Sequence, residues 1–295
     1  MEGLTLLGIL LGGVFHAAGL FLVAAGLQLV FGVQRILNLA CGSFYALGAY
    51  AGVSAVQWAL RLGLPRPLFL LALLAAGVAL AALGPLIERL LRTIYDRDES
   101  FQLLLTFALV LMLEDVIRFV WGTAPQQLGN VYLAYGQLRV GALTVPTYNL
   151  VVIACAAGIA LGMGYLLTRT RFGRIVVATA ENREMAAAMG IDMSGVYARV
   201  FTLGVALGTV GGALVIPATA AMNEMGIEVI VEAFAVVVIG GLGSMRGAFV
   251  GALVVGVLKA VAIATWPEGE MLVIYVIVIA VLVLRPAGLF ARATA

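Results

Sequence analysis

Residues 4–31 read LTLLGILLGGVFHAAGLFLVAAGLQLVF and contain no Asp, Glu, Lys or Arg. A helix needs about 20 predominantly apolar residues to cross the hydrocarbon of a bilayer. None of the apolar stretches in the chain alternates as the strands of an outer-membrane barrel do. The sequence therefore predicts an all-α polytopic membrane protein with about eight or nine transmembrane or broken helices. The further stretches lie at 43–60, 67–87, 101–121, 147–168, 199–222 and 247–264, with shorter ones at 229–242 and 271–284.

The composition excludes most soluble classes of protein. Of the 295 residues, 63% are hydrophobic and 11% are charged, whereas a soluble domain carries about 25% charged residues. So few charges also argue against nucleic-acid binding and intrinsic disorder. Cys41 and Cys155 lie in apolar stretches without metal-site spacing, so no metal centre is expected. The single histidine, His16, is expected to pack against neighbouring helices rather than to relay protons.

Arginine placement predicts how the chain lies in the membrane. The segments 88–100 and 169–198 are rich in arginine, and two apolar stretches separate them. Because cytoplasmic loops carry the excess of Lys and Arg, both segments are predicted to face the cytoplasm, which places the N-terminus outside. We expect one transmembrane domain over 1–295, with 169–198 as a cytoplasmic loop within it.

Two glycine-containing interruptions break the apolar pattern, GVQRILNLACGS at 32–43 and GGLGS at 240–244. Non-helical backbone at membrane depth is tolerated only where protein buries it or a cavity hydrates it, and paired interruptions are a pointer to a substrate path. The stretch 229–242 is expected to enter the membrane as a short or broken helix that ends at Gly240-Gly241. With Glu232 included, the candidate path residues are Asn38, Cys41, Gly42, Ser43, Glu232, Gly240, Gly241, Gly243 and Ser244.

The two interruptions also resemble each other. Gly42-Ser43 is followed by Gly48-Ala49, and Gly243-Ser244 is followed by Gly247-Ala248. In a chain with 36 glycines the match is either a trace of an internal repeat or a coincidence, and the sequence leaves both open.

Few charged side chains fall inside the apolar stretches. Arg118 comes four residues after Glu114 and three after Asp115, which favours local ion pairs at a helix end. Glu232 either lines a cavity or marks the outer interface, and Lys259 can extend toward the lipid headgroups. Because no chain of acidic residues and histidines runs through the stretches, proton coupling is not expected.

No catalytic or nucleotide-binding pattern is present. GGLGSMRG at 240–247 follows no predicted strand and lacks the Gly-Lys-Ser/Thr of a phosphate-binding loop, and Lys259 is the only lysine. If the protein uses ATP, another subunit must bind it. Since no Ser/His/Asp or HExxH arrangement appears either, the chain is not expected to be an enzyme.

The most informative polar segment is TRTRFGRIVVATAENREMAAAMGIDMSG at 168–195. Asn182 can cap a short helix that Gly190 stops in the left-handed conformation, and Asp192 or Ser194 can cap the helix that follows. A helix this short has little stability of its own, and its Ala and Met face fits a groove on a partner. The alternative is an ordinary connection between two helices.

This segment resembles a known pattern. Its central part, ENREMAAAMGID at 181–192, is similar to the cytoplasmic Glu-Ala-Ala…Gly loop of ABC-importer permeases, in the form found in the high-affinity branched-chain amino acid permease family. Three further stretches agree with that family: GLQLVFGVQRILNLACGSFYALGAY at 26–50, EAFAVVVIGGLGSMRGAFVGALVVG at 232–256 and RPAGLF at 285–290. One departure is Asn38-Leu39-Ala40-Cys41-Gly42, where family members commonly have Asn-Phe-Ala-His-Gly.

The resemblance implies a multi-pass permease subunit of a bacterial inner-membrane ABC importer for branched-chain or related small amino acids, or amide-like solutes. It implies an identical or homologous permease partner, two ATPase subunits that bind ATP and Mg²⁺, and a periplasmic substrate-binding protein. The permease itself would carry no cofactor. The loop would be the coupling helix on the ATPase, with contact residues Asn182, Glu184, Ala187, Gly190, Ile191 and Asp192. The competing hypothesis is a stand-alone secondary transporter or channel for a small polar solute, with the paired interruptions as its binding site.

Overall fold

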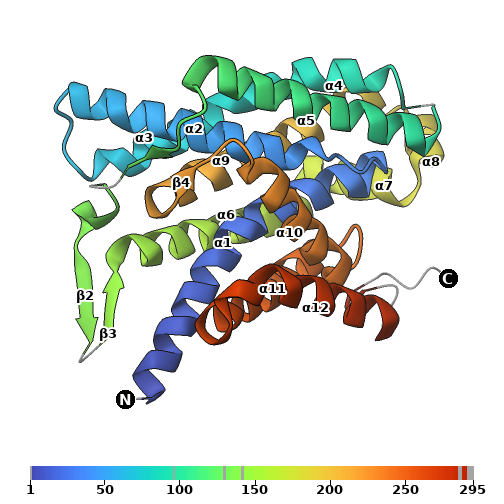
Figure 1. Cartoon of the computed structure of the whole chain (residues 1–295). Helices are drawn as coiled ribbons and strands as arrows, with labels where there is room; N and C mark the ends of the chain where they lie inside the picture. The colour runs from blue at the N-terminus through green and yellow to red at the C-terminus, as the bar shows by residue number, and fades with distance from the viewer. Residues whose placement is uncertain (1, 96, 129–130, 141–142, 285–287, 291–295) are drawn as a thin grey trace.

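The computed structural model describes residues 2–95, 97–128, 131–140, 143–284 and 288–290, and long helices dominate it (Figure 1). The helices are α1 Glu2–Gln34, α2 Ala40–Arg61, α3 Leu68–Leu80, α4 Gly84–Arg92, α5 Glu99–Trp121, α6 Thr147–Arg169, α7 Arg171–Glu181, α8 Arg183–Ala188, α9 Met193–Val215, α10 Met225–Gly240, α11 Met245–Thr265 and α12 Glu270–Leu284. A 3₁₀ turn at 81–83 joins α3 to α4. Each predicted apolar stretch is helical over most of its length, as expected for segments whose backbone polar groups have to be paired internally.

The predicted class, an all-α polytopic membrane protein, agrees with the structure. Among the described residues, five helical segments are long and apolar enough to cross a membrane: Leu6–Gln34, Leu68–Arg92, Thr147–Arg169, Met193–Ala218 and Met245–Thr265. α10 has 16 residues and α12 has 15, so they extend about 24 Å and about 22 Å, less than the about 30 Å of hydrocarbon. As predicted, α10 is short and ends at Gly240. The number of crossings and the sidedness of the N-terminus stay predictions.

α9 lies at the centre of the bundle. In the part that qualifies as a membrane span, 83% of its residues are buried, against 44% for α1 and 17% for α6. α1, α2, α3 and α4 pack around α9, while α10 and α11 pack against α1 (Figure 1). α6 packs against α1 and α7, and most of its surface is left uncovered.

Glycines let α9 approach its neighbours at backbone distance. A Cβ added to Gly212 would lie 1.9 Å from the Tyr45 carbonyl oxygen, and one added to Gly48 would lie 2.0 Å from the Thr209 carbonyl oxygen. In lipid, small residues that allow close packing decide which helices associate, because burial of apolar surface gives no advantage there. The contact between α2 and α9 therefore depends on positions where no side chain fits.

The bundle has two ends of different character (Figure 1). The first, called the hairpin end below, carries β2 Gln137–Val140 paired antiparallel with β3 Leu143–Pro146, and β1 Gln126–Gln127 paired antiparallel with β4 Ala220–Ala221. β1, β2 and β3 lie outside the predicted apolar stretches, whereas β4 lies at the end of the stretch 199–222. The sequence predicted none of these strands. The second, called the α8 end, carries α7 and α8.

Both arginine-rich segments lie at the α8 end. An Arg92 guanidinium nitrogen is 3.4 Å from the Ser194 carbonyl oxygen, and the Arg183 guanidinium lies over the Tyr197 ring at 5.2 Å from its centroid. The two arginine-rich segments therefore share one end of the bundle, and that this end faces the cytoplasm stays a prediction.

We expect that replacing Gly212 by Val separates α9 from α2 and lowers thermal stability, because overpacking a filled contact costs about 1–3 kcal/mol. Gly158→Val is the matched control, since a Cβ at that α6 position meets no atom within 4 Å. Thermal unfolding of the detergent-solubilised chain measures both. Equal melting temperatures for the two variants would contradict the proposed closeness of α2 and α9.

Candidate functional site

The first interruption separates α1 from α2 over residues 35–39. Arg35 adopts φ +61°, in the left-handed region, where α1 ends. The buried Asn38 side chain accepts a hydrogen bond from the Ala40 amide at 3.1 Å through Oδ1. This bond satisfies one of the unpaired N–H groups at the start of α2.

The other predicted path residues of this interruption lie in the first turn of α2, where the helix crosses α10. Cys41, Gly42 and Ser43 are all buried. A Cβ added to Gly42 would lie 2.1 Å from the Gly226 carbonyl oxygen of α10. In this arrangement of the helices, these residues make packing contacts.

The second interruption joins α10 to α11 through two glycines in the left-handed region. Gly241 has φ +93° and Gly243 has φ +79°, conformations that a side chain would disfavour. The Ser244 hydroxyl then accepts a hydrogen bond from the Gly247 amide at 3.1 Å and caps α11. Gly240 packs against the first turn of α11, because a Cβ added to Gly240 would lie 2.2 Å from the Gly247 carbonyl oxygen.

Gln28 of α1 holds this second interruption in place, a role that the sequence analysis missed. Its Nε2 donates to the Gly241 carbonyl oxygen at 2.8 Å, and its Oε1 accepts from the Gly243 amide at 2.5 Å. The side chain is 2% exposed, so both bonds form away from bulk solvent. The signal in the sequence for this role was a side-chain amide, Gln28, within the apolar stretch 4–31.

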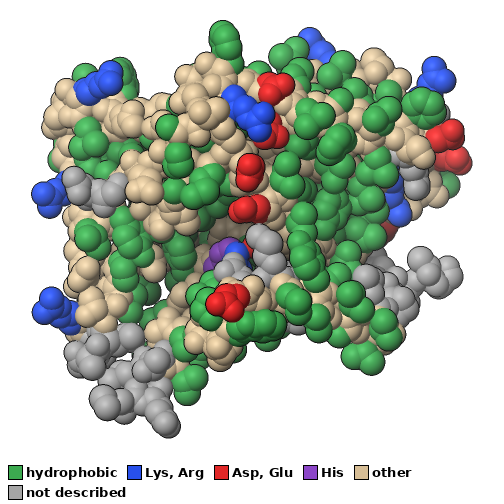
Figure 2. Space-filling model, in the orientation of Figure 1, with side chains coloured by type: hydrophobic (Ala, Val, Ile, Leu, Met, Phe, Trp, Pro, Cys, Tyr) green, Lys and Arg blue, Asp and Glu red, His purple; other side chains and the backbone are tan. Residues whose placement is uncertain are grey.

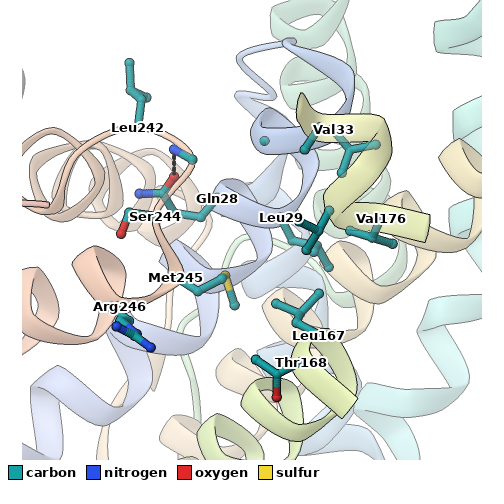
Figure 3. A pocket seen from close by; sticks show the side chains of 14 residues that line it. Gln28, Leu29, Val33, Leu167, Thr168, Val176, Leu242, Ser244, Met245 and Arg246 are labelled. Atoms are coloured by element: carbon teal, nitrogen blue, oxygen red, sulfur yellow. Dashed lines mark hydrogen bonds between the residues drawn. The ribbon is translucent and has the colours of Figure 1, made fainter. Parts of the chain in front are cut away.

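The two interruptions approach each other at a cavity of about 450 Å³ at the α8 end (Figure 3). A Cβ added to Gly32 would be 3.8 Å from the Gly243 Cα. Figure 3 shows Ser244, Met245 and Arg246 on one side of the cavity and Leu167 with Thr168 on the other. Of the predicted path residues, Gly243 and Ser244 line this cavity.

Glu232 is the centre of a buried ionic cluster that joins three helices. Its Oε2 is 2.8 Å from the His16 Nε2 of α1, and its Oε1 is 2.6 Å from the Lys259 Nζ of α11. The Glu232 side chain is 10% exposed and that of Lys259 is 15% exposed. Burial of an unpaired charge is costly. The Lys259 ammonium compensates the Glu232 carboxylate, which also shares a hydrogen bond with the His16 ring.

The geometry of this cluster answers where Glu232 lies and corrects the expectation for Lys259. Glu232 lies inside the protein rather than at an outer interface. Lys259 does not extend toward the headgroups, because the Glu232 carboxylate offers it a partner within hydrogen-bonding distance. His16 packs between helices as expected, and it also contacts Glu232.

Further charges lie on α5 near its hairpin end. Arg118 contacts Glu114 and lies 3.7 Å from Asp115, so the predicted local ion pairs are confirmed. Figure 2 shows acidic side chains and the single histidine on one face of the molecule, with the histidine in a hollow.

We expect that Lys259→Met destabilises the protein by about 3–5 kcal/mol, because it leaves a buried carboxylate with one partner fewer. Combining it with Glu232→Gln removes the charge and should restore much of the loss. Thermal unfolding of the single and double variants forms a double-mutant cycle. Strictly additive effects would contradict a direct coupling between the two side chains.

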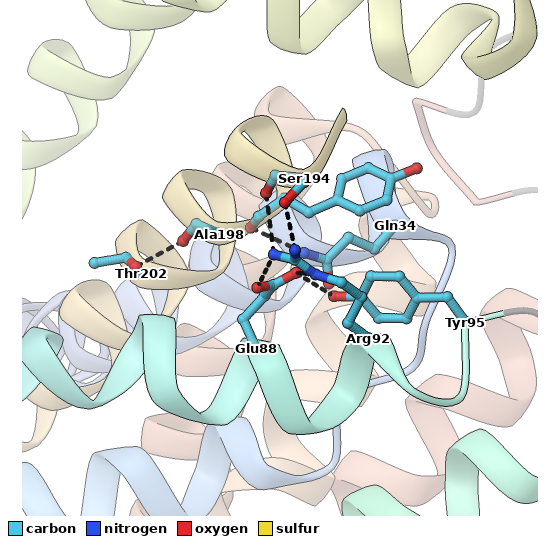
Figure 4. A network of polar contacts seen from close by, with 8 residues as sticks. Gln34, Glu88, Arg92, Tyr95, Ser194, Ala198 and Thr202 are labelled. Atoms are coloured by element: carbon cyan, nitrogen blue, oxygen red, sulfur yellow. Dashed lines mark hydrogen bonds and ion pairs between the residues drawn. The ribbon is translucent and has the colours of Figure 1, made fainter. Parts of the chain in front are cut away.

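A polar network at the α8 end ties α4 to the start of α9 (Figure 4). The Arg92 guanidinium donates to both carboxylate oxygens of the fully buried Glu88, at 3.1 and 2.6 Å, and also reaches Ser194. The Tyr95 hydroxyl donates to Glu88 at 3.2 Å. Burial and the nearby Glu88 carboxylate raise the pKa of Tyr95, so the hydroxyl keeps its proton and can donate.

The predicted short helix is present as α8. The Asn182 Oδ1 accepts a hydrogen bond from the Met185 amide at 2.9 Å, and Gly190 has φ +80°. The predicted cap and left-handed stop are therefore both confirmed. The side chains of Met185 and Met189 are 59% and 76% exposed.

The surroundings of α8 differ from the prediction in two respects. Segment 169–198 is largely helical, because α7 and the start of α9 occupy most of it. Asp192 stands at the N-cap position of α9 without a side-chain capping bond, and Ser194 contacts Arg92 instead. The predicted ATPase contacts lie on the surface, with Ile191 half-buried and the others exposed: Asn182, Glu184, Ala187, Gly190 and Asp192.

Comparisons with known proteins agree over almost the whole chain. A family model described as the permease component of a branched-chain amino acid transport system matches residues 9–282. The high-affinity branched-chain amino acid permease protein BraD of Pseudomonas aeruginosa is 25% identical, over 92% of this chain and 91% of BraD. LivH of Escherichia coli K12, with the same description, is 27% identical over 92% of this chain and 91% of LivH. The fructose import permease protein FrcC of Rhizobium meliloti is 28% identical over 85% of this chain and 73% of FrcC. The chain, a multi-pass membrane protein, therefore belongs to the family of branched-chain amino acid transport system permease components.

Proposed function

We propose that this chain is the membrane subunit of an ATP-driven importer that moves branched-chain or related small amino acids, or amide-like solutes. The family match over residues 9–282 is the observation that carries this proposal. BraD and LivH are described as branched-chain amino acid permeases, whereas FrcC is described as a fructose permease. The solute therefore needs a direct test.

The exposed short helix α8 supports a contact with a separate ATPase subunit. Its Ala and Met surface is unpaired in this chain, and Met185 and Met189 lie four residues apart on one face. A partner groove that receives this face would bury both side chains. We assign the ATPase contact to Asn182, Glu184, Ala187, Gly190, Ile191 and Asp192, and the ATP and Mg²⁺ to the partner.

The positions of the helix ends support a topology with the N-terminus outside. Nine segments would cross or enter the membrane: α1, α2, α3 with α4, α5, α6, α9, α10, α11 and α12. This places the arginine-rich α8 end in the cytoplasm, as the positive-inside rule requires. The hairpin end then faces the periplasmic binding protein.

Exposed charges on α5 support a second permease subunit as a partner. Asp115 is 78% exposed and Arg118 is 45% exposed, although both belong to a mainly apolar helix. Intramembrane charges usually face protein or water rather than lipid. A second permease, identical or homologous, would cover these charges, and the solute would pass between the subunits near Glu232.

The two interruptions would move during transport. Asn38 makes one hydrogen bond with the backbone of the first interruption, and Gln28 makes two with the second. Gly241 and Gly243 have positive φ and carry no side chain that would restrict the second interruption. The other residues that we assign to this role are Cys41, Gly42, Ser43, Gly240, Gly241, Gly243 and Ser244.

The complex with its cognate ATPases and binding protein should take up leucine into vesicles only when ATP is supplied. The purified chain alone should hydrolyse no ATP. Competition by isoleucine, acetamide and fructose identifies the solute class. Leucine accumulation by the chain alone, driven by an ion gradient without ATP, would instead identify a secondary transporter.

Replacing both Met185 and Met189 by Glu should abolish co-purification of the ATPase subunits, because the substitutions place charge in an apolar contact. Met222→Glu is the matched control, since Met222 is 53% exposed near β4 at the hairpin end. Affinity purification of the co-expressed complex measures the result. Normal assembly of the double variant would remove α8 from the contact.

A further inference from the structure

The cavity at the α8 end adjoins a second cavity, and the two share Met245 and Arg246 in their linings. The second cavity also measures about 450 Å³ and is lined mainly by residues of α1, α6 and α11. Its lining is almost entirely apolar and includes Phe21, Leu161, Gly164 and Phe249. Together the two cavities form a crevice that carries polar side chains among apolar ones at the α8 end and is almost entirely apolar toward the middle of the bundle.

The length of this crevice matches one leaflet of a bilayer. On α1 its lining runs from Phe21 to Val33, which corresponds to about 18 Å at the rise of an α-helix. Half of the hydrocarbon thickness is about 15 Å. An occupant with a polar head and a long apolar chain therefore fits the crevice, whereas a small polar solute would meet only apolar side chains in its deeper part.

The charge of the lining residues indicates which charge the polar head of the occupant should carry. Arg246 is the only charged residue among the described residues that line either cavity. It is exposed, and the described part of the chain offers it no carboxylate in an ion pair. Basic pockets between transmembrane helices on the cytoplasmic side suit anionic headgroups.

We propose that this crevice binds an anionic phospholipid, with the phosphate against Arg246 and one acyl chain between α6 and α11. Thr168 and Ser244 line the cavity at the α8 end on opposite sides (Figure 3). The Ser244 hydroxyl accepts from the Gly247 amide and can donate its proton to the headgroup, whereas the Thr168 hydroxyl donates to the Gly164 carbonyl oxygen. The headgroup would lie beside the second interruption, which Gln28 holds at Gly243. The bound lipid would thereby stabilise one position of that loop, whatever solute the protein carries.

Native mass spectrometry of the delipidated full-length chain tests this site with two lipids of identical acyl chains. Phosphatidylglycerol should bind about fivefold more tightly than phosphatidylcholine, as one arginine near the headgroup allows. Arg246→Gln should remove this preference. Gly164→Leu should weaken binding of both lipids, because it fills the apolar cavity at a position where a Cβ meets no atom within 4 Å.

Two control variants separate this site from general effects on charge and shape. Arg66→Gln removes an exposed arginine near the hairpin end, and Gly158→Leu adds the same side chain to α6 at another open position. Both should bind the lipids as the unmodified chain does.

Three outcomes would overturn the proposal. The first is an equal loss of phosphatidylglycerol binding in Arg66→Gln and Arg246→Gln, which indicates general attraction to charge. The second is displacement of the lipid by glycerol phosphate at millimolar concentration, which indicates a site for free phosphate. The third is displacement by leucine, which indicates a solute cavity.

Discussion

Buried backbone polar groups have to be paired, and this constraint shapes both interruptions. A helix pairs its own groups, but each break leaves several of them to be paired by other parts of the protein. The Gln28 side chain supplies a donor and an acceptor to the Gly241–Gly243 backbone, and Asn38 supplies an acceptor to the start of α2. The short helix α10 can end at Gly240 because the Gln28 side chain of α1 pairs backbone groups of the break that follows.

Buried charged side chains, like buried backbone groups, need partners within the protein. The cluster of His16, Glu232 and Lys259 joins α1, α10 and α11 through one carboxylate. A buried ion pair contributes little net stability compared with a well-packed apolar pair, but the loss of one partner is costly. The cluster therefore favours one relative position of the three helices and penalises positions in which the carboxylate loses its partners.

The α8 end combines an exposed helix with a firmly anchored neighbour. Met185 of α8 and Met189, which directly follows α8, are both exposed, and residues 189–192 connect α8 to α9. The start of α9 is held to α4 by Arg92, which the buried Glu88 orients. Since α9 is the central helix of the bundle, a partner that binds α8 would act on a helix that packs against α1, α2, α3 and α4.

The sequence by itself determined the membrane class, the approximate positions of the apolar helices, both interruptions and the short capped helix, although α7 and the start of α9 lie in the segment predicted as a loop. Each of these depends on local properties: the length of an apolar run, the conformational freedom of Gly190 and Gly241, and the capping geometry of Asn182. Even the pairing of Arg118 with Glu114 is local, because residues four apart share a helix face.

Only the tertiary structure decided which distant polar groups meet. His16 and Glu232 lie 216 residues apart, and Gln28 and Gly241 lie 213 apart, so no periodicity in a single stretch could join them. From the sequence, Lys259 was expected to extend toward the headgroups, because an isolated lysine gains most from reaching water. Asp192 was a candidate cap for the helix that follows it, and its side chain makes no capping bond in the folded chain. The packing of α1 against α10 and α11 provided a closer partner for the lysine. The physical reason is that hydrogen bonds and ion pairs depend on distance in space, whereas capping and apolar patterning depend on distance along the chain.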